Sequence, residues 1–195
     1  MSHGVRDRIR EALAGRQRKV VADPRFRRAA VLMPLYEDGE GLQVLFTRRS
    51  EALPQHKGQI AFPGGGHHLD DPNLLATALR ESEEEVGLRP GDVEIVGELD
   101  DTVTVTSNFV VAPFVGFIPY PYRFRVNTAE IVELIPLPLS LLSDHSRFKE
   151  EHWDRDGAKV PVYFYMIGSH VIWGLTARIL KQFLEAVPPT GRAAT

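Results

Sequence analysis

One amphipathic segment constrains the fold of this 195-residue chain more than any other part of it. Over residues 74–86 the apolar side chains recur with the period of an α-helix, and Gly87 follows as the expected C-terminal stop. With an advance of about 100° per residue, Glu81, Glu84 and Glu85 fall on one side of this helix, next to its apolar face. The sequence therefore predicts a helix that brings three carboxylates together beside the core.

The crowding of these carboxylates has two interpretations. Two carboxylates about 6 Å apart repel each other by ~3 kcal/mol at an effective dielectric constant of about 20, so a cluster inside a cleft requires a cation. Ligands that are carboxylate oxygens alone suit Mg²⁺ or Mn²⁺. The alternative is an ordinary charged surface, with Arg80 and Glu84 as an i,i+4 pair and Glu83 facing solvent. The helix by itself leaves both interpretations open.

A glycine-rich segment just before the helix favours a ligand site. Residues 48–73 contain few periodic apolar residues and include the run Phe62-Pro63-Gly64-Gly65-Gly66. Glycines let the backbone approach a ligand closely, and successive backbone N–H groups bind anions. Long ordered loops of this kind are typical of functional segments. Loop and helix together predict a site at their junction.

The helix and its flanks resemble the signature of the Nudix hydrolases. That signature runs Gly, five residues, Glu, seven residues, and then Arg-Glu-apolar-x-Glu-Glu-x-Gly-apolar. Its second half matches residues 80–88, Arg-Glu-Ser-Glu-Glu-Glu-Val-Gly-Leu, at every position except Ser82 in the apolar slot. In the first half, counted from Gly65, Asp71 replaces the glutamate and eight residues separate it from Arg80. This stretched form is similar to the coenzyme A pyrophosphatase branch of the family.

A second signature, upstream of the first, supports this branch. There, Leu-Leu/Phe-Thr, any residue, Arg and Ser/Ala are followed by three residues, Arg, three residues, Gly, three residues and Phe-Pro-Gly-Gly. This chain has Leu45-Phe46-Thr47-Arg48-Arg49-Ser50, then Gly58, then Phe62-Pro63-Gly64-Gly65, all in register. Pro54 stands where the branch has its second Arg. Nearby basic residues could replace that charge: Arg48, Arg49, His56 and Lys57.

The resemblance implies a fold and a reaction. The fold class would be α/β (α+β), a Nudix fold with a mixed β-sheet sandwiched between α-helices. The reaction would be hydrolysis of the diphosphate of coenzyme A or its thioesters to 3′,5′-ADP and 4′-phosphopantetheine or its acyl derivative. The cofactor would be Mg²⁺ or Mn²⁺, held by Glu81, Glu84 and Glu85 across the diphosphate. Such a cation lowers the pKa of a bound water, which attacks phosphorus in line.

The resemblance also assigns roles to individual residues. The expected catalytic residues are Glu81, Arg80 and Glu130. Arg80 would orient the glutamates by hydrogen bonds. The general base would be Glu81 or Glu130, the latter in a region where the family often has a further acid. The expected substrate-binding residues belong to the upstream signature: Arg48, Arg49, His56, Gly64 and Gly65.

Composition excludes several chemistries and divides the chain into segments. The absence of cysteine removes disulfides, thiol nucleophiles and cysteine-ligated metals. No apolar run approaches the length of a membrane span, so we expect a cytoplasmic protein without one. The net charge is −3, yet residues 1–28 carry nine Lys and Arg against three acids. We expect a basic N-terminal helix and linker over 1–28, the Nudix domain over 29–187 and a C-terminal tail over 188–195.

Two other functions stay open at this point. The same enzyme class could act on another nucleoside diphosphate derivative, such as ADP-ribose or a dinucleotide. This alternative stays open because Pro54 replaces an arginine of the coenzyme A branch. A noncatalytic nucleotide-binding module is the other, and the basic segment 1–28 would suggest nucleic acid as its partner. The complete glutamate set and the acidic net charge argue against that partner. A small-molecule substrate is expected, and a homodimer is left open.

The remaining periodicity predicts a sheet flanked by helices. We expect Trp173 in the core. Tyr120, Tyr122 and Phe124 are either core or sheet-face residues or a place where an adenine stacks. A helix is expected over 5–19, ending near Gly15, another over 171–187, and a short turn or helix over 136–142. Strands are expected over 29–36, 42–47, 60–62, 93–99, 103–105, 109–118, 130–135, 147–153 and 160–167.

Overall fold

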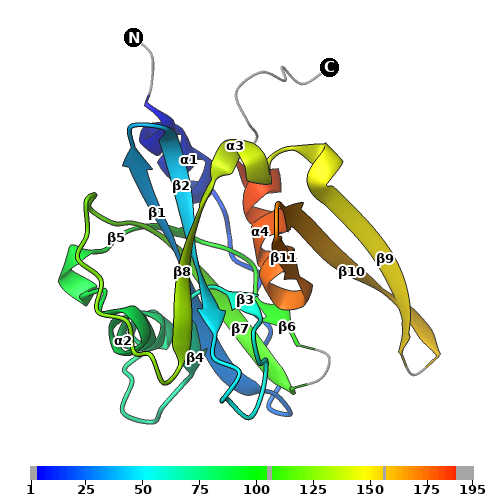
Figure 1. Ribbon diagram of the computed structural model, residues 1–195. Coiled ribbons are helices and arrows are strands. Elements are labelled where there is room, and N and C mark those ends of the chain that lie inside the picture. Colours follow the sequence, from blue (N-terminus) through cyan, green and yellow to red (C-terminus); the bar gives the residue numbers. More distant parts are fainter. Residues whose placement is uncertain (1–3, 105–106, 156, 188–195) are drawn as a thin grey trace.

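A mixed β-sheet forms the centre of the molecule (Figure 1). The computed structural model describes residues 4–104, 107–155 and 157–187. The central strand β1 (Arg27–Asp38) runs parallel to β7 (Phe109–Phe117) and antiparallel to β2 (Gly41–Arg49). The sheet order is β3-β2-β1-β7-β5, with β4, β6 and β8 paired to β1, β7 and β2. These other strands are β3 (Ile60–Ala61), β4 (Gly64–Gly66), β5 (Glu94–Glu98), β6 (Thr102–Val103) and β8 (Ile131–Pro138).

A three-stranded antiparallel sheet and four helices complete the described fold. The second sheet has the order β11-β10-β9 and is drawn at the right of Figure 1. Its strands are β9 (Phe148–Arg155), β10 (Ala158–Ile167) and β11 (His170–Trp173). The helices are α1 (Val5–Ala14), α2 (Leu74–Val86), α3 (Leu139–Leu142) and α4 (Gly174–Ala186), with short 3₁₀ turns at Pro90–Asp92 and His145–Arg147. In the described part of the chain, no helix combines the length and apolar character needed to cross a membrane.

Helix α2 has the predicted bounds, and local chemistry explains both of its ends. The side chain of Asn73 accepts the backbone N–H of Ala76 at the N-terminus. Gly87 adopts φ 71°, and its N–H donates to the carbonyl of Glu83. A left-handed residue at this place favours glycine because it lacks a Cβ. The one polar residue in the apolar slot, Ser82, is buried and donates its hydroxyl to the carbonyl of Ala78 at 2.7 Å.

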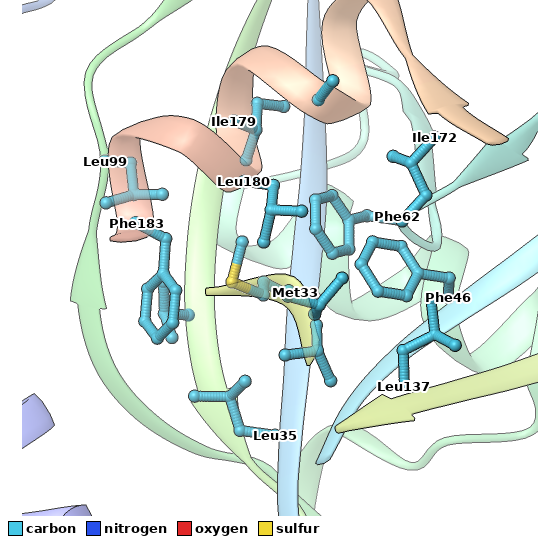
Figure 2. Packing of buried hydrophobic residues seen from close by; sticks show 14 of the residues in the cluster. Met33, Leu35, Phe46, Phe62, Leu99, Leu137, Ile172, Ile179, Leu180 and Phe183 are labelled. Carbon is cyan, nitrogen blue, oxygen red and sulfur yellow. The ribbon is translucent and has the colours of Figure 1, made fainter. Parts of the chain in front are cut away.

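The main sheet packs on both faces because successive residues of β1 point in opposite directions. Leu32 belongs to the core beneath α2, together with Ala78. Met33 belongs to the other core, where Leu180 and Phe183 of α4 cover the sheet (Figure 2). The helices therefore enclose a mixed sheet between them. This architecture confirms the predicted fold class.

The C-terminal segment differs from its prediction. A single helix was expected over 171–187, whereas its first residues form strand β11, which pairs with β10, and the helix begins at Gly174. Gly174 has φ 64°, a left-handed conformation that separates strand from helix. The β-branched Val171 and Ile172 fit the strand, and Ile172 enters the core. The predicted tail over 188–195 lies outside the described residues.

The basic N-terminal segment packs against the rest of the chain. Ile9 and Leu13 of α1 are buried in the core that contains α4. The predicted boundary at residue 28 falls inside β1, so the described part of this segment continues directly into the sheet. Its arginines pair with acids on and after β5: Arg10 with Glu94, Arg16 with Asp100, and Arg18 with Glu98 and Asp101. In these ion pairs, acids of the rest of the chain neutralise several of the positive charges of the N-terminal segment.

Candidate functional site

The most buried carboxylate of α2 is that of Glu85, which is 2% exposed. Its Oε2 accepts the backbone N–H of Gly64 at 3.1 Å, and its Oε1 accepts Nη1 of Arg49 at 3.3 Å. Burial raises the pKa of Glu85 to about 7, which these two contacts oppose and the charges of Glu81 and Glu130 reinforce. The helix thus places a carboxylate where water is largely excluded and a second acid is close.

The carboxylate of Glu81 lies directly against the backbone of β4. A Cβ added to Gly65 would come within 2.5 Å of Oε2 of Glu81. Burial raises the pKa of Glu81, the ion pair with Arg80 opposes this change, and the charge of Glu84 adds to it. At Gly64, φ is 152° and an added Cβ would lie 2.3 Å from the carbonyl oxygen of Ala30. Residues without a side chain are therefore required where β4 passes over the two glutamates.

Arg80 connects the glutamates to the loop that precedes α2. Its Nη1 lies 3.0 Å from Oε1 of Glu81 and donates to Oε2 of Glu84 at 3.1 Å. Nη2 donates to the carbonyl of Gly66 at 3.1 Å, and Nε donates to Oδ1 of Asp71 at 2.9 Å. A guanidinium with several fixed partners holds the side chains around it in defined orientations. These contacts agree with the orienting role expected for Arg80.

The carboxylate oxygens of Glu81, Glu84 and Glu85 are suitable ligands for a hard divalent cation. In this structure, however, the three side chains do not converge on one point. Glu85 offers buried oxygens, Glu81 is partly buried, and Glu84 is 56% exposed, so its side chain has room to turn. Arg80 draws the carboxylate of Glu84 to itself. As placed, no group of three or more His, Asp or Glu side chains in the described ranges could hold an ion.

Glu130 lies near this cluster, at the start of β8. Its Oε1 accepts Nδ2 of Asn127 at 3.1 Å, and its carbonyl accepts the N–H of Ser50 at 2.7 Å. Its charge contributes to the raised pKa of Glu85, which places the two acids within electrostatic reach of each other. Glu130 therefore acts on Glu85 through its charge, and its catalytic role stays a prediction.

A cavity of about 440 Å³ opens on the other side of β4. Its walls come from β1, β6 and β7 of the main sheet, from β9, β10 and β11, and from the first turns of α4. Gly64, Gly65 and Arg49 border this cavity and also contact the glutamates. His56 lines it as well, with Nδ1 at 3.0 Å from Oε1 of Gln59. Four of the five predicted substrate-binding residues therefore meet at one cavity.

The fifth, Arg48, is placed differently. Its Nε donates to Oε2 of Glu133 at 2.7 Å, and its Nη2 lies 3.0 Å from Nδ1 of His170. It is absent from the described lining of the cavity. Neighbouring residues of a strand face opposite sides, so Arg49 reaches Glu85 while Arg48 turns to β8 and β11. The structure gives Arg48 an ion pair outside this lining, and its expected contact with substrate stays a prediction.

The aromatic residues are also distributed differently from the sequence-based expectation. Trp173 is 36% exposed and lines the cavity, so its prediction as a core residue is wrong. Tyr120 stacks on Tyr36 with ring centroids 5.0 Å apart, and the hydroxyl of Tyr122 donates to Asp92 at 2.8 Å. Neither Tyr120 nor Tyr122 belongs to the described cavity lining. The β-branched residues before Trp173 and the glycine after it predict a short strand over 170–173, and that strand would have indicated that Trp173 lies at the surface.

Two comparisons with known proteins, one with family models and one with individual relatives, match the family that the sequence signatures resemble. The model of the NUDIX domain family matches residues 25–153. An uncharacterized Nudix hydrolase, NudL, from Photorhabdus laumondii is 38% identical over 161 residues, covering 83% of this chain and 85% of that protein. NudL from Yersinia pestis strain Pestoides F is also 38% identical over 161 residues, covering 83% of this chain and 80% of its own.

Solved structures share the fold at low sequence identity. A MutT/nudix family protein from Enterococcus faecalis superposes with a TM-score of 0.59 and 17% identity, covering 88% of this chain and 66% of its own. A NUDIX hydrolase from Alicyclobacillus acidocaldarius gives a TM-score of 0.51 and 18% identity, covering 82% of this chain and 91% of its own.

Proposed function

The chain belongs to the Nudix hydrolase family, and on this premise we propose that it is a metal-dependent pyrophosphatase that hydrolyses coenzyme A or its thioesters. The products are 3′,5′-ADP and 4′-phosphopantetheine or its acyl derivative. The upstream signature over 45–65, with its Phe62-Pro63-Gly64-Gly65 end, supports this substrate among the nucleoside diphosphate derivatives.

The observation that carries the proposal is the position of Glu85. Its carboxylate lies between the N–H of Gly64 and the guanidinium of Arg49, beside Glu81, and β4 separates it from a 440 Å³ cavity. A buried acid with a neighbouring acid is costly without a positive partner. Arg49 supplies one such partner, and a divalent cation would supply the stronger one. An acidic cluster next to a roomy cavity suits the hydrolysis of a diphosphate.

The residues of this chain divide the work. Glu81, Glu84 and Glu85 would hold Mg²⁺ or Mn²⁺, and such a cation neutralises the diphosphate and lowers the pKa of a water molecule beside it. Arg80 orients the glutamates through its contacts with them. The Nε of Arg49 is buried without a hydrogen-bond partner in the described structure. That free donor supports Arg49 as a contact for a phosphate oxygen.

The chemical step is an attack of water on one phosphorus of the anhydride. One P–O bond forms, the bridging P–O bond breaks, and the second phosphate leaves with the bridging oxygen. A carboxylate must accept the proton of the water. Glu130 is the proposed base because it lies near Glu85 and remains partly accessible, and Glu81 is the alternative.

A rival substrate class keeps the same site. The branch arginine is replaced by Pro54, which is exposed and lies outside the described cavity lining. A substrate such as ADP-ribose or a dinucleotide would use the same glutamates. By contrast, the basic segment that would suggest nucleic acid as the partner of a noncatalytic module has several of its arginines paired with acids of the body.

A chromatographic assay with purified protein separates these functions. Coenzyme A, acetyl-coenzyme A, ADP-ribose, NADH and a diadenosine polyphosphate are each incubated with Mg²⁺, Mn²⁺ or chelator. We expect metal-dependent release of 3′,5′-ADP from coenzyme A with the highest kcat/KM. Faster turnover of ADP-ribose would make the substrate assignment wrong while keeping the enzyme class. No turnover of any of the five would contradict the enzyme assignment.

A further inference from the structure

The wall of the cavity that faces the glycines carries an aromatic cluster. Phe164 of β10 and Trp173 of β11 are direct cross-strand partners, with ring centroids 6.3 Å apart and planes inclined by 10°. Trp153 of β9 lies 6.1 Å from Trp173. Of these three, Trp153 and Trp173 line the cavity. The site described so far uses none of them.

The position of this cluster follows from the two faces of the three-stranded sheet. Tyr165 and Ile172 point to the core and are buried. Phe164 and Trp173 alternate with them and therefore occupy the opposite face. Large apolar side chains exposed next to a cavity mark a binding surface more often than they serve stability. Trp173 thus offers a flat ring to whatever enters the cavity.

The same wall is positively charged. Arg155 of β9 and Arg178 of α4 line the cavity, and no Asp or Glu does so in the described residues. Arg178 donates Nη2 to the carbonyl of Pro161 at 3.2 Å, and its guanidinium lies over the ring of Tyr163, 5.8 Å from the centroid, so both contacts are with uncharged groups. For Arg155, no hydrogen bond or ion pair is found within the described part of the chain. Two guanidinium groups therefore line the cavity, and neither has a carboxylate partner among the residues that the structure describes.

We propose that this wall is a subsite for a heteroaromatic base that carries a phosphate group of its own, outside the diphosphate that is cleaved. Trp173 stacks on the base, and Arg155 and Arg178 contact the additional phosphate. The proposal rests on the proposed function, because it takes the glutamate side of β4 as the place of the diphosphate. It adds the residues that select the nucleotide half of the substrate.

The chemistry of the wall favours the nucleotide half over the other half of coenzyme A. A nucleobase presents a flat π-surface to an indole, and each such stack strengthens binding by about fivefold or more. Arginine binds phosphate through paired N–H donors. The pantetheine half is a flexible chain without a ring or a further charge, so it would leave both features unused. The 3′-phosphate of the adenosine half uses them together.

The test measures binding without metal and without turnover. Isothermal titration calorimetry in chelator compares 3′,5′-ADP with 5′-AMP, which differ by one phosphate. We expect wild-type protein to bind 3′,5′-ADP at least tenfold more tightly. Arg178→Gln and Arg155→Gln should each reduce this preference to threefold or less. Trp173→Leu should weaken both nucleotides at least fivefold, and Trp173→Phe should restore most of the affinity.

Matched controls keep the result interpretable. Arg89→Gln removes an exposed arginine outside the cavity and should leave the preference unchanged. Thermal unfolding of each variant identifies any that fail to fold. If Arg178→Gln unfolds because it loses the contact with Pro161, Arg155→Gln tests the phosphate contact alone. Equal affinity of wild type for both nucleotides, no binding of either, or an unchanged affinity of Trp173→Leu would each overturn the subsite.

The subsite and the proposed function fail separately. Hydrolysis of coenzyme A without the binding preference would remove the subsite and keep the pyrophosphatase. The binding preference without hydrolysis of coenzyme A would keep the subsite and remove the proposed reaction. Kinetics add a third readout: with coenzyme A and its 3′-dephospho form as substrates, the Arg155 and Arg178 variants should change the ratio of the two KM values, and the control Arg89→Gln should leave that ratio unchanged.

Discussion

Arg80 and Asp71 form a two-point ion pair at the entrance to α2. Nε of Arg80 donates to Oδ1 of Asp71 at 2.9 Å, and Nη2 donates to Oδ2 at 3.1 Å. Oδ2 also accepts the N–H of His68 and the hydroxyl of Thr77. The aspartate stands where the family signature has glutamate, one residue further from the arginine. Despite the additional residue between Asp71 and Arg80, this ion pair therefore still connects the loop to Arg80, which orients the glutamates.

Asp71→Asn should destabilise the protein and slow the reaction. The hydrogen bonds from Arg80 hold the pKa of Asp71 well below its usual range, so the ionised form is the stable partner. Replacing it leaves a half-buried guanidinium without its acid and frees Arg80 to move from Glu81. We expect a loss of ~1–3 kcal/mol in the free energy of unfolding, measured by urea denaturation at pH 7. A reduced kcat should accompany it.

The same pair predicts a pH dependence with a defined sign. Because the pKa of Asp71 is lowered in the folded state, its stabilisation is complete above the ordinary value of 3.8 and is lost as the pH falls below it. The difference in unfolding free energy between wild type and Asp71→Asn should therefore be constant from pH 5 to 7. It should shrink as the pH falls below the ordinary pKa of 3.8. A constant difference down to pH 2.5 would contradict the ion-pair assignment.

Glu85→Gln should lower kcat by on the order of 10²-fold or more while leaving the fold intact, because a charged ligand of the cation is lost. Glu83→Gln is the matched control, since Glu83 lies on the same helix with an exposed side chain. Steady-state kinetics with coenzyme A at saturating Mg²⁺ measure both. Unchanged turnover of Glu85→Gln, or equal losses in the two variants, would remove Glu85 from the site.

Gly65→Ala should impair the enzyme through a single methyl group. Its Cβ would lie 2.5 Å from Oε2 of Glu81, so the carboxylate must move. At the next residue, Gly66, an added Cβ meets nothing within 4 Å, so Gly66→Ala is the control. We expect kcat to fall at least tenfold for the first variant and to stay within about threefold for the second. Similar kinetics for the two would show that the position of Glu81 does not depend on β4.

The parts of the molecule that were predicted correctly depend on local signals. The helix over Leu74–Val86 has a clear period, and it is followed by glycine in the left-handed conformation. The hairpin of β1 and β2 follows from the turn around Gly39, where the side chain of Asp38 accepts the N–H of Glu40 at 2.8 Å. Neighbouring residues settle such features, so a sequence pattern is sufficient to find them.

The parts that were missed depend on residues far apart in the chain. Trp173 is exposed because β11 pairs with β10, and the periodicity of 171–187 alone favoured a helix. The partner of Arg48, Glu133, is also 85 positions away and could not be found from local patterns. The position of the glutamates and the pairing of Arg80 with Glu84 were predicted from the helix, whereas the contacts with Gly64 and Gly65 arise only after β4 folds back over α2. Patterns of apolar residues contain no information on such partners.

Mg²⁺ or Mn²⁺ should raise the melting temperature of the wild-type protein. A ligand that binds only the folded state at 100 times its Kd stabilises it by ~2.7 kcal/mol, which corresponds to about 5–10 °C for a chain of this size. Differential scanning fluorimetry with metal or chelator measures this shift. It should be largely lost in Glu85→Gln and Glu81→Gln and retained in Glu83→Gln. An equal shift in all variants would place the cation elsewhere.

Among the ion pairs between the N-terminal segment and the rest of the chain, those of Asp101 should contribute most to the free energy of unfolding. We therefore expect Asp101→Asn to cause the largest loss of stability. The side chain of Asp101 is 0% exposed, and it accepts Nε of Arg18 at 2.9 Å, the N–H of Val21 at 2.9 Å and Nη2 of Arg28 at 3.3 Å. Removing one partner of a buried pair costs ~3–5 kcal/mol, because the remaining charges stay desolvated. For a chain of this size, such a loss lowers the melting temperature by about 6–20 °C.

The control for this prediction is Asp23→Asn in the same N-terminal segment. Asp23 pairs with Arg25, whose side chain is mostly in solvent, so that pair contributes at most ~1 kcal/mol. Calorimetry of the two variants should separate them by several degrees, with Asp101→Asn the lower. Equal melting temperatures would mean that the N-terminal segment adds little to the stability of the sheet. A lower value for Asp101→Asn would show that the ion pairs of Asp101 hold the N-terminal segment against the domain.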